Sequence, residues 1–270
     1  SIGRSILGPD TNVKRFSRND LQHFVAQHYG AGRIVLAAAG GIDHDQLRNL
    51  ATQAFGDLPA VSAAAAPSLA QFKAGEFRKE RTLEQAHFTL GFEGPSYRDD
   101  AIYTAQIYAI ALGGGMSSRL FQEIREKRGL CYTIFAQAGA YVDTGMTTIY
   151  AGTSGDQLGD LSLLTIDEIK RAADDLSQAE LDRARAQMKA GLLMGLESAS
   201  NRAERLARMM QIWGKIPDLS ETVERIDAVD LDKLRTYAQH VATQAKVTTA
   251  LYGPIGSAPG LEELETRRVA

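Results

Sequence analysis

The sequence predicts an α+β protein made of two homologous domains, the first of which is truncated on its N-terminal side. Two patterns support this prediction: helix-like and strand-like apolar periods alternate along the chain, and a helix–strand unit recurs near both ends. The chain has 270 residues, and a domain holds roughly 100–200, so two domains are favoured over one. Hydrophobic residues make up 44% of the chain, enough for a substantial core.

Composition excludes several classes of protein. With 30 Lys+Arg against 33 Asp+Glu, the chain has no excess of positive charge for nucleic acid or an anionic membrane. Cys131 is the single cysteine, which excludes an internal disulfide framework and a cysteine-based zinc cluster. No apolar run reaches the length of about 18 residues that a membrane span needs, and we expect a soluble protein. Ser1 is not an initiator Met and no signal-peptide pattern follows, so we expect a processed product or a fragment.

The N-terminal part reads as helix, strand and helix. Ser17 is typical of a residue that caps a helix, and Asp20 lies three positions later, near the positive end of that helix. The apolar run at 33–39, bounded by glycines, predicts a buried strand, and Asp43 opens a helix to about residue 55. Residues 60–75 are rich in small residues and have no clear period, so they predict a linker.

The remainder alternates strands and helices. Residues 86–93 alternate apolar and polar side chains, as expected of a strand with one buried face. The turn Asp143-Thr144-Gly145 predicts a hairpin, and Ser177 with Glu180 forms a capping-box pattern. We expect the tail after Gly256 to be loosely held. The other expected elements are strands at 76–83, 131–141, 147–153 and 246–252, and helices at 99–112, 155–173, 178–196, 199–213 and 230–242.

A weak internal repeat supports two related domains. At a constant separation of 210 positions, apolar and charged residues recur, and each helix then leads to a Gln-His pair and an apolar strand ending in Gly-x-Ile. Chance similarity between two amphipathic helix–strand units is the alternative interpretation. The matched residues are Val13, Arg15, Asp20 and Leu21 with Val223, Arg225, Asp230 and Leu231.

Three possible sites have a simpler structural explanation. His23 and His28 are five positions apart, so on a helix they diverge and do not form the paired ligands that zinc needs. Gly113-Gly114-Gly115 matches neither a P-loop nor a dinucleotide fingerprint, and it is typical of a connector that ends one helix, with Ser117 or Ser118 capping the next. Cys131 has no base nearby in sequence, so we expect an inert thiol.

The segment from Ser117 to Tyr132 gives the strongest functional signal. It reads as a short amphipathic helix that leads through Gly129 into a strand. Arg125 near the end of the helix and Tyr132 near the start of the strand can converge on one point. A guanidinium and a phenolic hydroxyl suit peptide carbonyls or a developing oxyanion.

The run from Leu112 to Tyr132, reading LGGGMSSRLFQEIREKRGLCY, resembles the non-catalytic half of pitrilysin-type (inverted zincin) zinc metallopeptidases. That family includes mitochondrial processing peptidase and insulin-degrading enzyme. The stretches 3–8, 33–41 and 55–59 resemble the end of the family's first domain, and 87–95 resembles an early strand of the second. The resemblance covers nearly the whole chain up to about residue 255.

The resemblance implies two α/β-roll domains, each a mainly antiparallel sheet packed with helices, that close around an extended peptide. The first carries H-x-x-E-H and a downstream Glu as zinc ligands, whereas the second contributes an Arg and a Tyr that here match Arg125 and Tyr132. Arg125 would hold backbone carbonyls and Tyr132 would donate to the scissile carbonyl. No H-x-x-E-H occurs in this chain, so zinc would be bound elsewhere, and this chain alone would bind no metal, hold no catalytic residue and hydrolyse nothing.

We therefore expect the C-terminal, substrate-binding portion of a zinc-dependent processing endopeptidase. Its partners would be an extended peptide or unfolded protein and a missing N-terminal half or a zinc-bearing subunit, in a homo- or hetero-dimer. The alternatives are a natural non-catalytic subunit and a scaffold without a peptide role. By resemblance the compartment is the bacterial cytoplasm or periplasm, or the mitochondrial matrix. The expected domains are 1–59 (remainder of the zinc-bearing domain), 60–75 (linker), 76–256 (substrate-binding domain) and 257–270 (tail).

Overall fold

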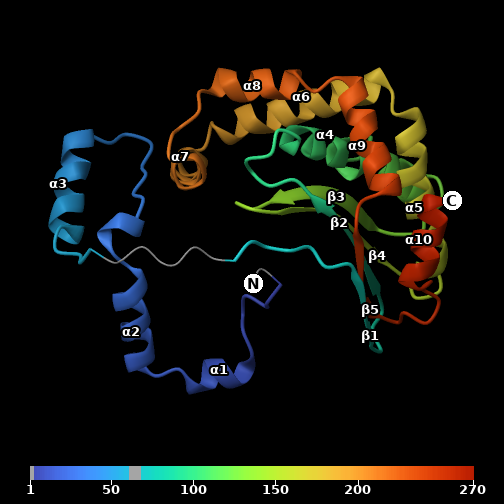
Figure 1. The fold of residues 1–270 in the computed structure, drawn as a ribbon, viewed down its shortest axis with the longest axis horizontal. Helices are drawn as coiled ribbons and strands as arrows, with labels where there is room; N and C mark the ends of the chain where they lie inside the picture. Colours follow the sequence, from blue (N-terminus) through green and yellow to red (C-terminus); the bar gives the residue numbers. More distant parts are fainter. Residues whose placement is uncertain (1–2, 61–67) are drawn as a thin grey trace. The chain divides into compact units, whose positions relative to one another are not determined.

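The computed structural model describes residues 3–60 and 68–270 (Figure 1). The chain divides into two compact units. The first comprises Ser1–Ala70 and Leu193–Pro217, and the second comprises Gln71–Leu192 and Asp218–Ala270. The first of the three boundaries, between residues 70 and 71, falls inside the expected linker of residues 60–75, part of which (61–67) lies outside the described residues. Residues 193–217, which the sequence placed in the substrate-binding domain, group with the first unit instead.

A five-stranded sheet forms the centre of the second unit, in the order β1-β5-β2-β4-β3. Strands β2, β3, β4 and β5 pair antiparallel, whereas β1 pairs parallel to β5 at the edge. The expected hairpin at 143–145 is confirmed, because β3 and β4 pair directly. The strands are β1 (Gly75–Glu80), β2 (Ala86–Gly94), β3 (Thr133–Ala140), β4 (Gly145–Thr153) and β5 (Val247–Gly253).

The alternation predicted for β2 divides its side chains between the two faces of the sheet. Phe88, Leu90 and Phe92 are buried, whereas His87 and Thr89 are partly exposed on the other face. Helices α4, α5, α9 and α10 lie along one side of the sheet (Figure 1). The core therefore forms between these helices and the buried face, and it includes Ile107, Tyr108, Leu161, Ile166 and Leu234.

Two helices of the second unit, α6 and α9, begin at side-chain caps, and the sequence predicted the one before α6. The capping box before α6 is confirmed, since the Ser177 N–H donates to Glu180 Oε2 (2.9 Å) and the Glu180 N–H donates to Ser177 Oγ (3.4 Å). Asp230 caps α9 by accepting from the Lys233 N–H at 2.8 Å. The helices are α4 (Ile102–Gly113), α5 (Leu158–Asp175), α6 (Gln178–Gly195), α8 (Leu219–Asp227), α9 (Leu231–Thr243) and α10 (Leu261–Val269), and η2 (Phe121–Glu126) is π-helical.

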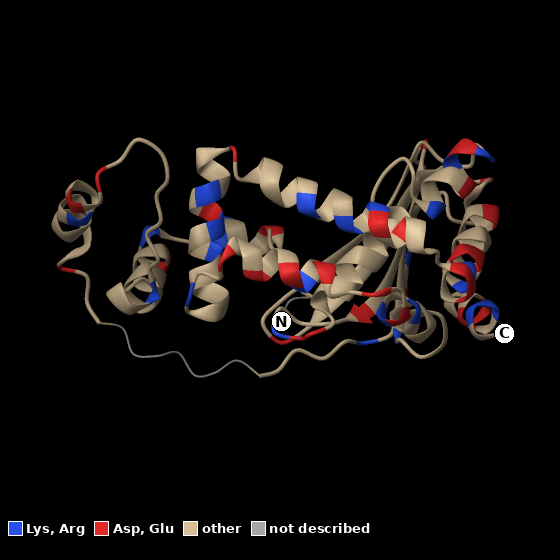
Figure 2. Ribbon diagram, turned by 90° about the horizontal axis from the view of Figure 1, so that it is seen from above, with Lys and Arg blue, Asp and Glu red and all other residues tan. Residues whose placement is uncertain are grey.

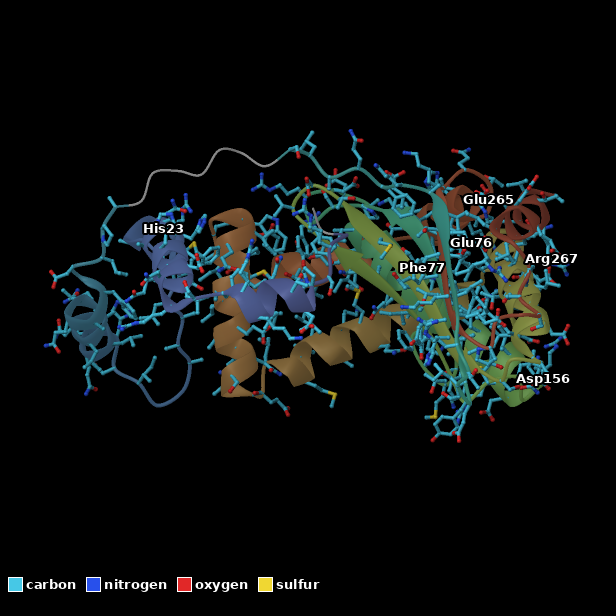
Figure 3. The ribbon with its side chains drawn as sticks, turned by 90° about the horizontal axis from the view of Figure 1, so that it is seen from below. His23, Glu76, Phe77, Asp156, Glu265 and Arg267 are labelled. Carbon is cyan, nitrogen blue, oxygen red and sulfur yellow. The ribbon has the colours of Figure 1, made fainter. Side chains whose placement is uncertain are left out.

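Two helices of the second unit differ from the sequence-based expectation. The short helix α8 was not predicted, and the expectation of a loosely held tail after Gly256 is wrong. Helix α10 buries Leu264 and Arg268, although its sequence is highly charged. Its exposed side is also tied down, because Arg267, labelled in Figure 3, donates twice to Asp167 of α5 at 2.7 Å.

The first unit is helical and has few buried side chains. The predicted caps are confirmed: Ser17 and Asp20 form a capping box on α2, and Asp43 accepts from the Gln46 N–H at 2.8 Å to cap α3. None of the residues of α2 is buried. The unit contains α1 (Asp10–Arg15), α2 (Arg18–His28), η1 (Ala31–Arg33), α3 (His44–Phe55) and α7 (Ala199–Trp213).

The prediction of a buried strand at 33–39 is wrong. Arg33 ends η1, residues 34–39 have no regular structure, and Leu36 is 52% exposed. The local sequence does favour an extended chain, but a strand also needs a neighbour to accept its backbone hydrogen bonds. Among the described residues, none is paired with this segment in a sheet.

The structure favours a different register for the suggested internal repeat. Ser17 and Asp230 both cap a helix, and Gly40 and Gly253 both have positive φ angles, +125° and +113°. Each pair is separated by 213 positions, three more than the sequence suggested, so Asp20 does not correspond to Asp230. In this register the segment 34–39 corresponds to β5, the strand that lies between β1 and β2.

Charges of both signs are distributed along the helices. Blue and red segments alternate in Figure 2, in keeping with the nearly balanced composition of 30 Lys+Arg and 33 Asp+Glu. Within the described parts of the chain, the helices are too short or too polar to cross a membrane.

Candidate functional site

The glycine segment places the helix that carries Arg125. Helix α4 ends at Gly113, where a Cβ atom would lie 2.5 Å from the backbone N of Ala136 in β3, so glycine permits the close approach of helix and strand. The sequence suggested that Ser117 or Ser118 caps the following helix, but the helix has no side-chain cap. The Ser118 hydroxyl instead donates to the Gly115 carbonyl at 2.6 Å. The connector is thereby folded back on itself rather than free.

The next segment begins with helical residues at 119–120 and continues as η2. Leu120 and Ile124 are fully buried and anchor it to the core. Its end is a Schellman turn: the Gly129 N–H donates to the Arg125 carbonyl and the Leu130 N–H donates to the Ile124 carbonyl, both at 3.0 Å. Gly129 has a φ of +64°, a conformation that glycine adopts without strain.

This turn brings Arg125 and Tyr132 together. The Arg125 Cζ lies 5.3 Å from the centroid of the Tyr132 ring and 4.5 Å from the centroid of the Phe121 ring. Two aromatic rings therefore hold the guanidinium, each through a cation–π contact. Tyr132 is 79% exposed, and the side chain of Arg125 is 29% exposed. The prediction that these two side chains lie close together is confirmed.

The side chains of Arg125 and Tyr132 are both hydrogen-bond donors. An arginine side chain has five N–H donors and no acceptor, and a tyrosine hydroxyl can donate one hydrogen bond. Arg125 uses one guanidinium nitrogen on Glu126, at 3.3 Å, in a contact at the surface. The arrangement suits recognition of carbonyl oxygens.

Cys131 lies between Arg125 and Tyr132 in the sequence, but it does not share their exposed site. It is buried, and burial raises the pKa of its thiol to about 11, although the nearby Arg125 acts in the opposite direction. The thiol is therefore protonated at neutral pH and unreactive. The strand expected from Cys131 begins at Thr133, and the Leu130 carbonyl accepts from Thr153 Oγ1 at the end of β4.

The described residues do not fit a zinc site. Across residues 3–60 and 68–270, no three His, Cys, Asp or Glu side chains come together as ligands. His87 Nδ1 lies 2.8 Å from the Tyr150 hydroxyl, and His28 packs against Phe24 with ring centroids 4.4 Å apart. The neighbours of these two imidazoles are thus a tyrosine and a phenylalanine, which are not zinc ligands in such a cluster.

Sequence reasoning did not identify the charged residues on the other side of this helix. Arg119 donates to both carboxylate oxygens of Glu180 (2.6 and 2.8 Å), and Glu123 accepts from Lys127 (2.5 Å) and Arg128 (2.9 Å). The i,i+4 spacing of Glu123 and Lys127 was the one local signal. The contact between Arg119 and Glu180 spans 61 positions and leaves no local signal.

The chain is similar in sequence to bacterial proteins named zinc proteases. It is 35% identical over 257 residues to an uncharacterized zinc protease of Rickettsia bellii, covering 94% of this chain and 61% of that protein. It is 32% identical over 262 residues to an uncharacterized zinc protease of Bacillus subtilis, covering 96% of this chain and 63% of that one. The chain thus spans about three fifths of these relatives.

Solved structures share the fold. The crystal structure of a peptidase M16 inactive domain from Pseudomonas fluorescens matches with a TM-score of 0.83 at 22% identity, over 95% of this chain and 62% of that one. A chain of complex III2 from Candida albicans matches with a TM-score of 0.85 at 21% identity, over 97% and 65%. The family model of the peptidase M16 inactive domain matches residues 15–188. The chain therefore belongs to the peptidase M16 inactive domain family.

Proposed function

We propose that this chain is the substrate-binding portion of a zinc-dependent endopeptidase whose zinc ligands lie in another half or subunit. Membership of the inactive-domain family and relatives named zinc proteases support the reaction class. Each relative extends well beyond the region that this chain matches, since the match covers 61% and 63% of them. The substrate class is an extended peptide or an unfolded protein.

Arg125 and Tyr132 contact the substrate in this proposal. The observation that carries it is the stacking of the guanidinium on the exposed Tyr132 ring, 5.3 Å from its centroid. Arg125 holds backbone carbonyls of the peptide, and the Tyr132 hydroxyl donates to the scissile carbonyl as negative charge develops. Donors aimed at developing charge lower the barrier because they bind the transition state more tightly than the ground state.

The zinc-bearing partner covers the exposed apolar surface of the first unit. In the repeat register, Leu21 and Val25 of α2 correspond to Leu234 and Ala238 of α9. The α9 pair is fully buried, whereas Leu21 is 57% and Val25 is 49% exposed. A surface that is apolar in both repeats and buried in one is typical of an interface in the other. The partner is a missing N-terminal half or a separate zinc-bearing subunit.

Cleavage of an unfolded protein by the assembled protein tests the proposal. We expect Arg125→Ala and Tyr132→Phe to lower kcat/KM about 10- to 100-fold without changing the melting temperature. Arg125→Ala removes the donors to the peptide's backbone carbonyls, and Tyr132→Phe removes the donor to the scissile carbonyl. Matched controls are Arg267→Ala on α10 and Tyr141→Phe beyond β3, which should cleave normally. Normal cleavage by both site variants would refute the substrate-contacting role.

A natural non-catalytic subunit is the second candidate. The neighbour from complex III2 shows that this fold occurs in a chain of a multisubunit assembly, although a likeness at 21% identity concerns the fold alone. This alternative predicts that the assembled protein cleaves at the same rate with Arg125→Ala as without it. It also predicts that removal of this chain dissociates or destabilises the assembly.

A further inference from the structure

The helical segment that carries Arg125 has a second set of charged side chains, on the side away from Tyr132. Arg119 and Glu123 are four positions apart and share one side of the segment, as Phe121 and Arg125 share the other. Residues two positions apart project to roughly opposite sides of a helix. The side chains of Arg119 and Glu123 are only 11% and 13% exposed, which is low for charged residues.

Arg119 fastens the start of the segment to the junction between α5 and α6. Its guanidinium binds both oxygens of Glu180, at 2.6 and 2.8 Å, and also the carboxylate and the carbonyl of Asp175. Glu180 accepts from the Ser177 hydroxyl (2.7 Å) in the same capping box that begins α6. A bidentate pair with a carboxylate that is itself held fixes orientation as well as distance.

Glu123 fastens the end of the segment. Its carboxylate accepts from Lys127 at 2.5 Å and from Arg128 at 2.9 Å, and the same Arg128 nitrogen donates to the Glu123 carbonyl at 2.8 Å. Lys127 and Arg128 form the turn that precedes Gly129. Arg171 of α5 lies 4.0 Å from Glu123 and 2.7 Å from Glu168, so α5 is part of the network.

The unusual backbone of the segment gives the contacts of Arg119 and Glu123 a role. Residues 121–126 are π-helical, and the Lys127 N–H donates to the Gln122 carbonyl, five positions earlier, at 3.0 Å. A π-helical turn is rarer than an α-helical turn and is frequent at functional sites. A change in its winding would rotate Arg125 away from Tyr132, because the two residues lie on either side of the turn that follows it.

We propose that Arg119 and Glu123 are positioning residues that hold the π-helical winding of residues 121–126 and thereby the direction of Arg125. The proposal rests on the function proposed above for Arg125. Neither residue touches the substrate in this proposal. Both act on Arg125 through the backbone of residues 119–126. A guanidinium displaced by about 1 Å can lower a rate by about 100-fold, so modest rewinding has a measurable effect.

The test compares variants in the assembled protein, with and without Arg125. We expect Arg119→Met and Glu123→Gln each to lower kcat/KM about tenfold in the wild-type background. In the Arg125→Ala background the same changes should have no further effect, since they act through a side chain that is no longer present. A merely structural role would lower the rate by the same factor in both backgrounds. Affinity for an uncleaved peptide, measured after zinc removal by a chelator, should follow the same pattern.

Controls separate this proposal from the one on which it depends. Asp167→Asn removes a similar ion pair on α5, with Arg267, and should leave cleavage unchanged. Arg119→Lys keeps the charge but loses the bidentate geometry, so it should rescue the rate only in part. If Arg125→Ala lowers the rate and Arg119→Met and Glu123→Gln do not, or do so equally in both backgrounds, the positioning role is wrong and the proposed function stands. If Arg125→Ala has no effect, both proposals are wrong.

Discussion

The guanidinium of Arg125 lies 5.3 Å from the centroid of the Tyr132 ring, although seven positions separate the two residues in the chain. Between them, Gly129 reverses the backbone with a φ of +64°. The Leu130 carbonyl then binds Thr153, which fixes the chain as it enters β3. One turn residue therefore brings a cation and a phenol together at the surface.

Gly129→Ala should destabilise the chain by about 1 kcal/mol, because a Cβ is disfavoured at positive φ. A Cβ at this position would have no neighbour within 4 Å, so the cost comes from the backbone alone. The control is Gly191→Ala in α6, which also has open space and should stabilise by about 0.5–1 kcal/mol through helix propensity. Chemical denaturation measures both, and equal effects of the two changes would argue against the turn geometry.

Stability should fall in acid through Glu180. Burial raises the pKa of Glu180, but hydrogen bonds from Arg119 and Ser177 outweigh this and lower it from 4.5 to about 2. A lowered pKa contributes stability that is present above the ordinary value of 4.5 and is lost as pH falls toward 2. Glu180→Gln should therefore cost on the order of 2 kcal/mol at pH 7 and much less at pH 3.

Unfolding curves at several pH values measure the difference between wild type and Glu180→Gln. Asp182→Asn on the same helix is the control, since that side chain is 59% exposed and should have little effect at either pH. A constant difference between wild type and Glu180→Gln from pH 7 to pH 3 would contradict the account of the Arg119 contact.

Two adjacent arginines of α10 should differ strongly in their contribution to stability. Arg268 is buried, donates to the carbonyls of Val241 (2.5 Å) and Ala245 (3.0 Å), and has a pKa lowered by that burial. Its replacement by Met leaves two buried acceptors without donors and should cost about 2–4 kcal/mol. Arg267→Met removes an exposed pair with Asp167 and should cost less than about 1 kcal/mol. Thermal unfolding measures both, and the reverse order would contradict the packing of α10.

Backbone exchange should separate the segment 34–39 from its counterpart β5. Amides of β5 lie between β1 and β2 and should exchange slowly, whereas those of 34–39 have no sheet partner among the described residues and should exchange fast. When the zinc-bearing half or subunit is bound, 34–39 should become protected as a strand. Hydrogen–deuterium exchange measures both states, and slow exchange of 34–39 in this chain alone would contradict the proposed interface.

The elements with local signals were predictable from the sequence. The alternation at 86–93, the turn at 143–145 and the capping box of Ser177 and Glu180 each involve neighbouring residues, and each was confirmed. The convergence of Arg125 and Tyr132 also follows from local structure, because one turn of known type separates them.

The features that depend on distant residues were not predictable. The run at 33–39 has the composition of a strand, but pairing decides whether a strand forms. The parallel pairing of β1 with β5 joins segments that are far apart in the chain. Helix α10 reads as a polar tail because its buried Arg268 donates to carbonyls of α9 and of the residues after it, and lies over the ring of Phe92 in β2. Arg119 was missed for the same reason, since its carboxylate partners lie on α5 and α6.

A double-mutant cycle on cleavage by the assembled protein tests the central claim most directly. If Arg125 and Tyr132 bind the same carbonyl-bearing segment of the substrate, Arg125→Ala, Tyr132→Phe and the double variant should give losses in kcat/KM that are not additive. The expected coupling is about 1 kcal/mol or more, the range typical of residues in contact that share a task. Wild-type values of kcat/KM in all three variants would contradict the claim that this pair acts on the substrate.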